Sequence, residues 1–154
     1  MSIYHTAEMI EASALGQTIR ESTWLFPAIE SGHLLALALL GGSVLIISLS
    51  VLGVGLKSSP AEIYKSARRY MDGAVIILLI TGLLLGVSEP VKLYDRQAFW
   101  VKMISMVIAI ALTYFAFNPM VRRGSSGVVI RSVTVLTMAS WLMVAIAGRW
   151  IGFS

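Results

Sequence analysis

Residues 31–56 read SGHLLALALLGGSVLIISLSVLGVGL and carry no charged side chain between Glu30 and Lys57. A helix needs about 20 apolar residues to cross the hydrocarbon layer of a bilayer. Because no water reaches that depth to bond free amides, the backbone must close its own hydrogen bonds as a helix. This run therefore predicts a membrane-spanning helix and restricts the whole chain to a membrane fold.

Three further runs lack charged side chains, over residues 73–88, 103–121 and 132–148. All the runs are continuously apolar, whereas the strands of a membrane barrel alternate between apolar and polar residues. The sequence therefore predicts an all-α, integral membrane four-helix bundle. With their flanks, the runs predict spans over about residues 24–56, 71–89, 98–117 and 128–151.

The composition leaves room for this bundle and little else. Hydrophobic residues make up 57% of the 154-residue chain and charged residues 13%, against about 25% charged in an ordinary soluble domain. We therefore expect residues 1–154 to form a single membrane domain in contact with the lipid bilayer. The chain has no Cys, which excludes disulfides and thiolate ligands.

The N-terminal segment has the pattern of an amphipathic surface helix over residues 3–20. Ile3, Ala7, Ile10 and Ala14 share one stripe. A helix of this kind can lie along the membrane interface. The alternative is a helix that packs on the mouth of the bundle.

Local signals place several helix boundaries. Residues 59–62 read SPAE, a capping box with Pro at the first helical position. This predicts that the second helix starts at Pro60 as a short extension and enters the membrane near Met71. The third helix is predicted to stop at Asn118-Pro119. Gly82 and Gly86 form a small-xxx-small pair, for which packing inside the bundle is the favoured interpretation.

The basic residues predict the orientation. Seven Lys and Arg lie in the first and third connections and five in the rest of the chain. Basic loops stay in the cytoplasm, so both termini are predicted to lie on the outer side. The seven are Lys57, Lys65, Arg68, Arg69, Arg122, Arg123 and Arg131.

Ionisable residues at membrane depth are costly, so they usually face the interior and have a partner or a function. In the predicted topology, five meet near the outer level: Glu30, His33, Glu89, Lys102 and Arg149. They could form a structural lock between helix ends, or a site bordered by Trp100 and Trp150. At the inner level, Asp72 can pair with Arg68, Arg69 or Arg131.

His33 is the one histidine inside a predicted span. Neutral imidazole is a good ligand for haem iron, so His33 is a candidate axial ligand of haem b. A second ligand would have to come from His5 or from a Met sulfur. The nature of any bound metal is left open.

The sequence lacks the motifs that several other chemical functions require. The sequence has no glycine-rich phosphate loop, no His-x-x-x-His pair and no paired carboxylates inside the spans. No catalytic residues are predicted, and we expect no catalytic activity from the chain on its own. The basic loops are short and lack interleaved aromatic residues, which argues against nucleic acid as a partner.

Four stretches carry a resemblance to a known group of proteins. They are WLFPAIESGH (residues 24–33), TG (81–82), FWVK (99–102) and GRWI (148–151). Together they resemble an uncharacterised family of bacterial four-span membrane proteins. More distantly, the chain is similar to copper-resistance D-type membrane proteins and to cytochrome b-type four-helix bundles. The resemblance implies a bacterial cytoplasmic (inner) membrane location and, through the distant relatives, haem or copper and electron transfer, with His33 as the counterpart of a ligand on the first helix.

These observations lead to three hypotheses. The first is a non-catalytic integral membrane subunit or anchor of a larger membrane complex, such as a redox complex, with other membrane subunits or further copies of the chain as partners. The alternative is a haem-binding electron carrier that uses His33. The third is a small metal-handling transporter with Glu30, His33, Glu89 and Lys102 lining an outer vestibule. Transporters usually have broken helices around a midplane site, and no polar group is predicted near the middle of the second to fourth spans.

Overall fold

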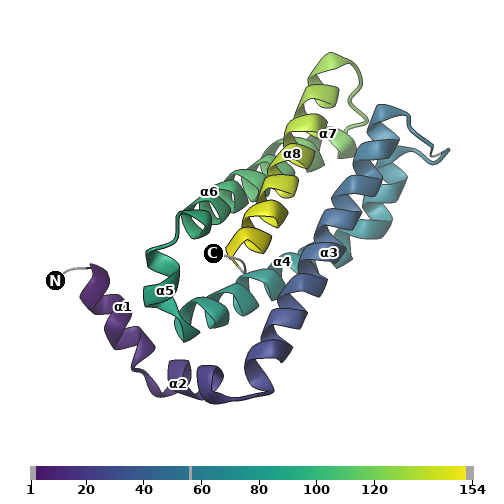
Figure 1. The fold of residues 1–154 in the computed structure, drawn as a ribbon. Coiled ribbons are helices and arrows are strands. Elements are labelled where there is room, and N and C mark those ends of the chain that lie inside the picture. The colour runs from purple at the N-terminus through teal and green to yellow at the C-terminus, as the bar shows by residue number, and fades with distance from the viewer. Residues whose placement is uncertain (1–2, 56, 152–154) are drawn as a thin grey trace.

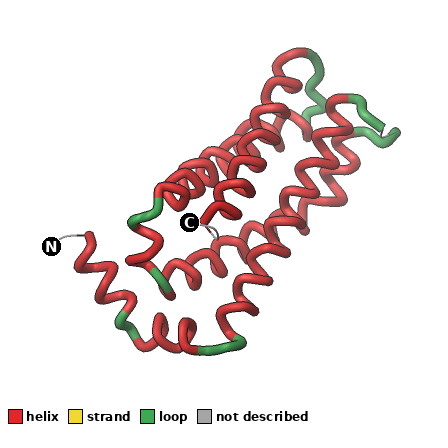
Figure 2. Tube along the Cα trace, in the orientation of Figure 1, coloured by secondary structure: helices red, strands yellow, loops and turns green. Residues whose placement is uncertain are grey.

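The computed structural model describes residues 3–55 and 57–151, and its elements are all helical (Figures 1 and 2). Four helices are long and apolar enough to cross a membrane, as the sequence predicts. The first two are α3 (Leu25–Leu52) and α4 (Pro60–Ser88). The third is a composite of α6 (Gln97–Ala111), η1 (Leu112–Phe117) and α7 (Asn118–Arg122), and the fourth is α8 (Val128–Ile151). The all-α membrane bundle is therefore confirmed.

The four spans are arranged as two packed pairs. α3 lies along α4, α6 lies along α8, and α3 and α8 join the two pairs. The α3–α4 and α7–α8 connections lie at one end of the bundle (Figure 1). The short helix α5 (Pro90–Tyr94) and the N-terminal helices lie at the other. Buried apolar side chains from all four spans form the core, including Leu40, Met71, Phe117 and Val144.

The two ends of the α3–α4 connection are set by local backbone chemistry. Gly53 adopts φ 77° and donates its N–H to the last carbonyls of α3, a conformation that glycine reaches without a steric cost. The helix therefore ends at Leu52, before the predicted boundary at residue 56, which itself lies outside the described residues. At the other end the predicted capping box is confirmed: Ser59 Oγ accepts from Glu62 N, and Glu62 Oε2 accepts from Ser59 N.

The first turns of α4 pack against the rest of the bundle. The sequence predicted that they would form an extension below a span that begins near Met71. In the structure Tyr64 is already buried, and α4 contacts α7 as well as α3. The reason is the short connection, because only seven residues separate the end of α3 from the start of α4. The start of α4 is therefore level with the end of α3.

The third span continues past Asn118-Pro119, contrary to the prediction that it stops there. Residues 112–117 form a π-helix, in which the N–H of Asn118 donates to the carbonyl of Thr113. This wider turn ends one helical segment and starts the next, so Pro119 lies in the first turn of α7. In that position the missing N–H of proline costs nothing.

The N-terminal segment forms two helices instead of the single predicted one. α1 (Ile3–Glu11) and α2 (Ala14–Glu21) are separated at Ser13, whose hydroxyl caps α2 by accepting from Gly16 N at 3.2 Å. Both pack on the bundle: Ile19 is 1% exposed, and Glu11 Oε2 accepts from Val91 N. The segment therefore packs on the mouth of the bundle. The side chain of Ile3 lies outside the described part.

Gly16 of α2 packs closely against the backbone of α4. A Cβ added at Gly16 would lie 2.9 Å from the carbonyl oxygen of Val87 and 3.1 Å from that of Ile10. Backbone atoms cannot rotate out of the way, so we expect Gly16→Val to release α2 from α4. Amide hydrogen exchange over residues 14–21 should rise by roughly tenfold or more. Leu15→Val is the matched control, because Leu15 is 54% exposed, and a similar rise in both variants would contradict the prediction.

Candidate functional site

The end of the bundle that holds the N-terminal helices contains a polar cluster built around His33. His33 lies two turns into α3 and is 5% exposed, as expected for an ionisable group that faces the interior of a membrane bundle. Its Nδ1 lies 2.9 Å from Thr81 Oγ1 on α4. The hydroxyl of Thr81 in turn donates to the carbonyl oxygen of Ile77 at 2.6 Å. The imidazole is therefore held against α4 by a chain of two hydrogen bonds.

Lys102 on α6 approaches the opposite side of the ring. Its Nζ lies 3.3 Å from His33 Nε2. The Lys102 residue as a whole is half-buried. Three spans thus meet at one imidazole: α3 supplies the ring, α4 the hydroxyl and α6 the ammonium.

The hydrogen-bond partners define the tautomer of His33. The Thr81 hydroxyl donates its one hydrogen to the carbonyl oxygen of Ile77. Toward His33 it can therefore only accept, so Thr81 Oγ1 accepts from His33 Nδ1–H. An ammonium has only donors, so Nε2 must offer its lone pair to Lys102. The ring is therefore neutral, with its proton on Nδ1, and both of its nitrogens have partners.

Two glycines provide the space for these side chains. A Cβ on Gly82 would lie 3.3 Å from His33 Cε1, and one on Gly148 would lie 3.6 Å from Lys102 Nζ. The ring and the lysine chain therefore lie almost directly on the backbones of α4 and α8. Each of the four stretches that carry the family resemblance contributes a residue here: His33, the pair Thr81 and Gly82, Lys102, and Gly148.

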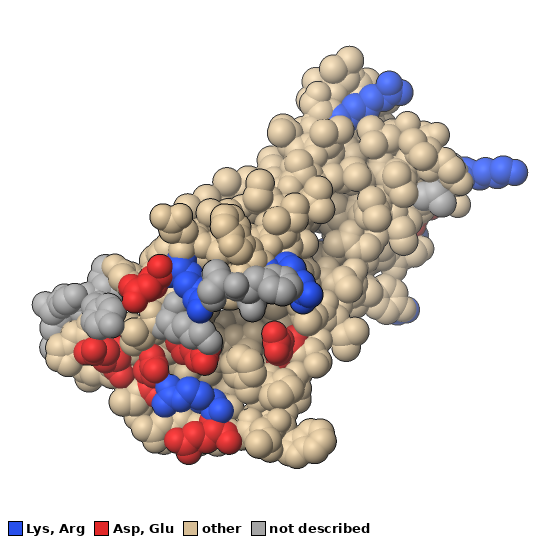
Figure 3. All heavy atoms as spheres, in the orientation of Figure 1, with Lys and Arg blue, Asp and Glu red and all other residues tan. Residues whose placement is uncertain are grey.

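The structure brings together only part of the predicted outer cluster. His33 and Lys102 are in contact, whereas Glu30 is exposed on α3, and among the described residues no hydrogen bond or ion pair joins it to them. Glu89 is the half-buried residue between α4 and α5, and Arg149 is an exposed residue in the last turn of α8. Thr81 was not predicted as a member. Figure 3 shows acidic and basic side chains together at this end of the molecule.

Three tryptophan residues lie at the same end of the bundle as His33. Trp24, Trp100 and Trp150 are 84%, 47% and 57% exposed. Trp100 donates its Nε1–H to the carbonyl of Tyr94 and packs edge-on against the ring of Tyr94. This exposure is consistent with anchoring at the level of the headgroups.

Further polar groups lie within the third and fourth spans. Thr113, in the π-helix, accepts from Trp141 Nε1 at 2.9 Å and donates to the carbonyl of Ala109. The next residue, Tyr114, donates to Asp72 Oδ1 at 2.9 Å. Two consecutive residues of the π-helix therefore bind α8 and α4, and π-helical turns are frequent at functional positions.

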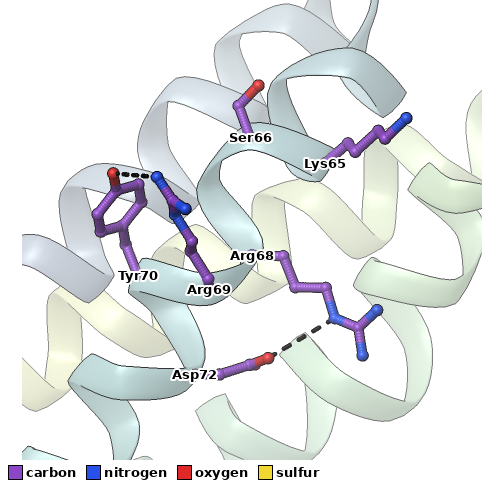
Figure 4. Close-up of a pocket in the computed structure, with 6 residues that line it drawn as sticks. All are labelled: Lys65, Ser66, Arg68, Arg69, Tyr70 and Asp72. Carbon is purple, nitrogen blue, oxygen red and sulfur yellow. Dashed lines mark hydrogen bonds and ion pairs between the residues drawn. The ribbon is translucent and has the colours of Figure 1, made fainter.

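Asp72 also pairs with Arg68, which was one of the three arginines predicted as its partner. Arg68 Nε lies 3.6 Å from Asp72 Oδ2 (Figure 4). The carboxylate thus receives a hydrogen bond from η1 and a charge from the preceding turn of its own helix. The sequence indicated the arginine but not the tyrosine, because nothing in the apolar run around Tyr114 marks a π-helix.

The ligand set is a poor fit for haem or for a metal ion. Iron could bind His33 only at Nε2, and there it would have to displace Lys102. The other face of the ring packs on Gly82, and His5, the other histidine of the sequence, is exposed on α1. No group of three or more His, Cys, Asp or Glu among the described residues could hold a metal ion.

The four apolar spans and their polar cluster define a multi-pass membrane protein. The chain belongs to DUF6644, a family of unknown function whose model matches residues 6–154. Comparison with curated proteins and with solved structures gives no match.

Proposed function

We propose that the chain is a non-catalytic integral membrane subunit that anchors or completes a larger membrane complex. The observation that carries this proposal is how little of each span is buried within the chain. The apolar windows of the four spans are buried to 33%, 22%, 17% and 28% in chain order. Most of the apolar surface is therefore available to lipid and to other helices. The bacterial cytoplasmic membrane, with both termini outside, is the setting that the resemblance and the loop charges support.

Glycines on outward-facing surfaces support the same proposal. A Cβ added at Gly41, Gly42, Gly73 or Gly86 would meet no atom within 4 Å. The sequence favoured packing inside the bundle for the pair Gly82 and Gly86. Gly82 has this role against His33, but Gly86 does not. Small residues let another transmembrane helix approach closely, so these positions suit a helix from a partner subunit or a second copy.

The polar cluster around His33 supports a structural role. The Thr81 hydroxyl donates to a carbonyl of its own helix, and both nitrogens of His33 have hydrogen-bond partners. Hydrogen bonds of this kind hold transmembrane helices in register. We infer that the cluster keeps three spans at fixed relative depths and so presents a rigid outer surface to a partner.

The mass of the mildly extracted protein tests the proposal. We expect native mass spectrometry to show a complex with another subunit, or an ordered homo-oligomer. Gly86→Leu should weaken that assembly by about tenfold or more, because its side chain would occupy the space of the approaching helix. Phe115→Leu, at a residue that is 84% exposed, is the control for an ordinary lipid-facing change. A stable monomer without any partner in mild detergent would overturn the proposal.

The same sample tests the electron-carrier alternative through its visible spectrum. We expect no Soret band, since haem would have to displace Lys102 from His33. A Soret band that disappears in His33→Ala would favour the haem-binding carrier. Protein from haem-replete cells should be used, so that a missing band reports the binding site rather than the supply of haem.

A further inference from the structure

The inner half of α4 is more polar than the spans beside it. The bond between His33 and Thr81 fixes the depth of α4 in the bundle. At about 1.5 Å per residue, Asp72 and Arg69 lie about 14 and 18 Å along α4 from Thr81. On α8, the first charged residue inward from Gly148 is Arg131, about 26 Å away. Charged side chains of α4 therefore reach one to two turns deeper than those of α8.

These side chains surround a hollow on the surface of α4. It has a volume of about 520 Å³ and is lined by residues 65–72 (Figure 4). The lining contains three cationic groups and one carboxylate, which leaves a formal charge of +2. The lining residues are Lys65, Ser66, Arg68, Arg69, Tyr70 and Asp72.

Local contacts hold the two guanidinium groups in place. Arg69 Nη2 donates to Tyr70 Oη at 2.9 Å, and the guanidinium lies 4.9 Å from the centre of that ring. Arg68 is held by Asp72, which is itself tied to Tyr114. Each guanidinium has five N–H donors, so both retain donors for an anion. Lys65 is exposed beside them.

An apolar stripe continues from this hollow along the same face of α4. Positions that follow each other by three or four residues share one side of a helix. Lys65, Arg69 and Asp72 are followed on that side by Ile76, Ile80 and Leu83. The last three are 58%, 55% and 70% exposed. The face is thus cationic at its inner end and apolar toward the outer end. An anionic phospholipid has the complementary arrangement, with a charged headgroup at one end and apolar acyl chains at the other.

We propose that this face binds an anionic phospholipid, with its phosphate in the hollow at Lys65, Arg68 and Arg69. The hydroxyl of Ser66 adds a donor, and an acyl chain lies along Ile76, Ile80 and Leu83. Basic pockets at membrane depth recognise anionic headgroups in this way, and guanidinium groups match phosphate with paired hydrogen bonds. The bound headgroup neutralises cations that would otherwise face hydrocarbon, which explains how α4 can carry them so deep.

The test compares two double variants that remove the same charge. Wild type is placed in phosphatidylcholine nanodiscs, and phosphatidylglycerol binding is measured by native mass spectrometry. Each cation near an anionic headgroup contributes about a fivefold factor in affinity, so Lys65→Gln with Arg69→Gln should weaken binding roughly 25-fold. Lys57→Gln with Arg131→Gln, at the same end but outside the hollow, should weaken it less than about threefold. Equal losses in the two variants would show diffuse attraction and overturn the site.

Two further measurements use the unmodified chain and do not depend on how the variants fold. A phosphatidylglycerol probe with a photoreactive group in its acyl chain should label α4 at residues 76–83. Labelling spread evenly over all four spans would overturn the proposal. Inorganic phosphate should not compete at millimolar concentration if the acyl chain contributes to binding. Full competition by phosphate would show that the hollow binds a free anion, and it would overturn the proposed lipid site.

Discussion

Gly82→Leu is expected to destabilise the protein by about 3 kcal/mol. Overfilling a well-packed contact costs about 1–3 kcal/mol, and each hydrogen bond that is lost adds about 1 kcal/mol. A Cβ at this position already lies 3.3 Å from His33 Cε1. A leucine side chain would push the imidazole away from Thr81 and Lys102, so both effects apply.

Unfolding of the purified protein in detergent, followed by circular dichroism, measures this loss. Gly86→Leu is the control, because it is the same substitution one turn along the same helix, where a Cβ meets nothing within 4 Å. It should change the stability of the monomer by less than about 0.5 kcal/mol. If Gly82→Leu is as stable as Gly86→Leu, His33 is not packed on α4 as the structure shows.

Trp141→Ala should cost about 4 kcal/mol. Trp141 is 5% exposed in the core, and its indole N–H donates to Thr113 Oγ1. Removing a buried tryptophan side chain leaves a cavity, at a cost of about 3–5 kcal/mol. The loss should also loosen η1, because Thr113 would lose its partner on α8.

Two further substitutions separate the contributions at this position. Trp141→Phe keeps most of the buried ring and loses the hydrogen bond, so we expect it to cost about 1–2 kcal/mol. Trp150→Ala removes the same side chain from a position that is 57% exposed and should cost less than about 1 kcal/mol in detergent. The same thermal or denaturant titration serves all three variants. A loss of equal size for Trp150 and Trp141 would argue against the buried position of Trp141.

Most of the fold could be predicted because the bilayer leaves the backbone few choices. The start of the fourth span at Val128 and the capping box at Ser59 follow from local chemistry that the sequence displays. The end of α3 was misplaced because Gly53 stands within an apolar run. Only its φ of 77° shows that it ends the helix. The break of the N-terminal segment at Ser13 depends on packing against α4, which a single helical pattern does not contain.

The third span shows where a local rule gives the wrong result. Asn118-Pro119 normally marks the end of a helix. Here the preceding π-turn changes the register, so the proline starts a new segment. No residue type in an apolar run predicts a π-turn. For the same reason, the contacts of Thr113 and Tyr114 could not be foreseen.

The candidate site was predictable in part. His33 and Lys102 were predicted together because both are costly at membrane depth and fall at the same level. Thr81 was missed, since a threonine inside a helix usually bonds its own backbone, and this one does so while also accepting from His33. Glu30 was included because it falls at the same level as His33, but in the structure its side chain is exposed.

The pairing of α3 with α4 and of α6 with α8 has a consequence for biogenesis. Each pair consists of neighbours along the chain joined by a short connection, so each hairpin can enter the bilayer and close on itself before the other has been synthesised. The contact between His33 and Lys102 joins residues of different hairpins. It can therefore form only after the third span has inserted, so this hydrogen bond joins the second hairpin to a first hairpin that is already in place.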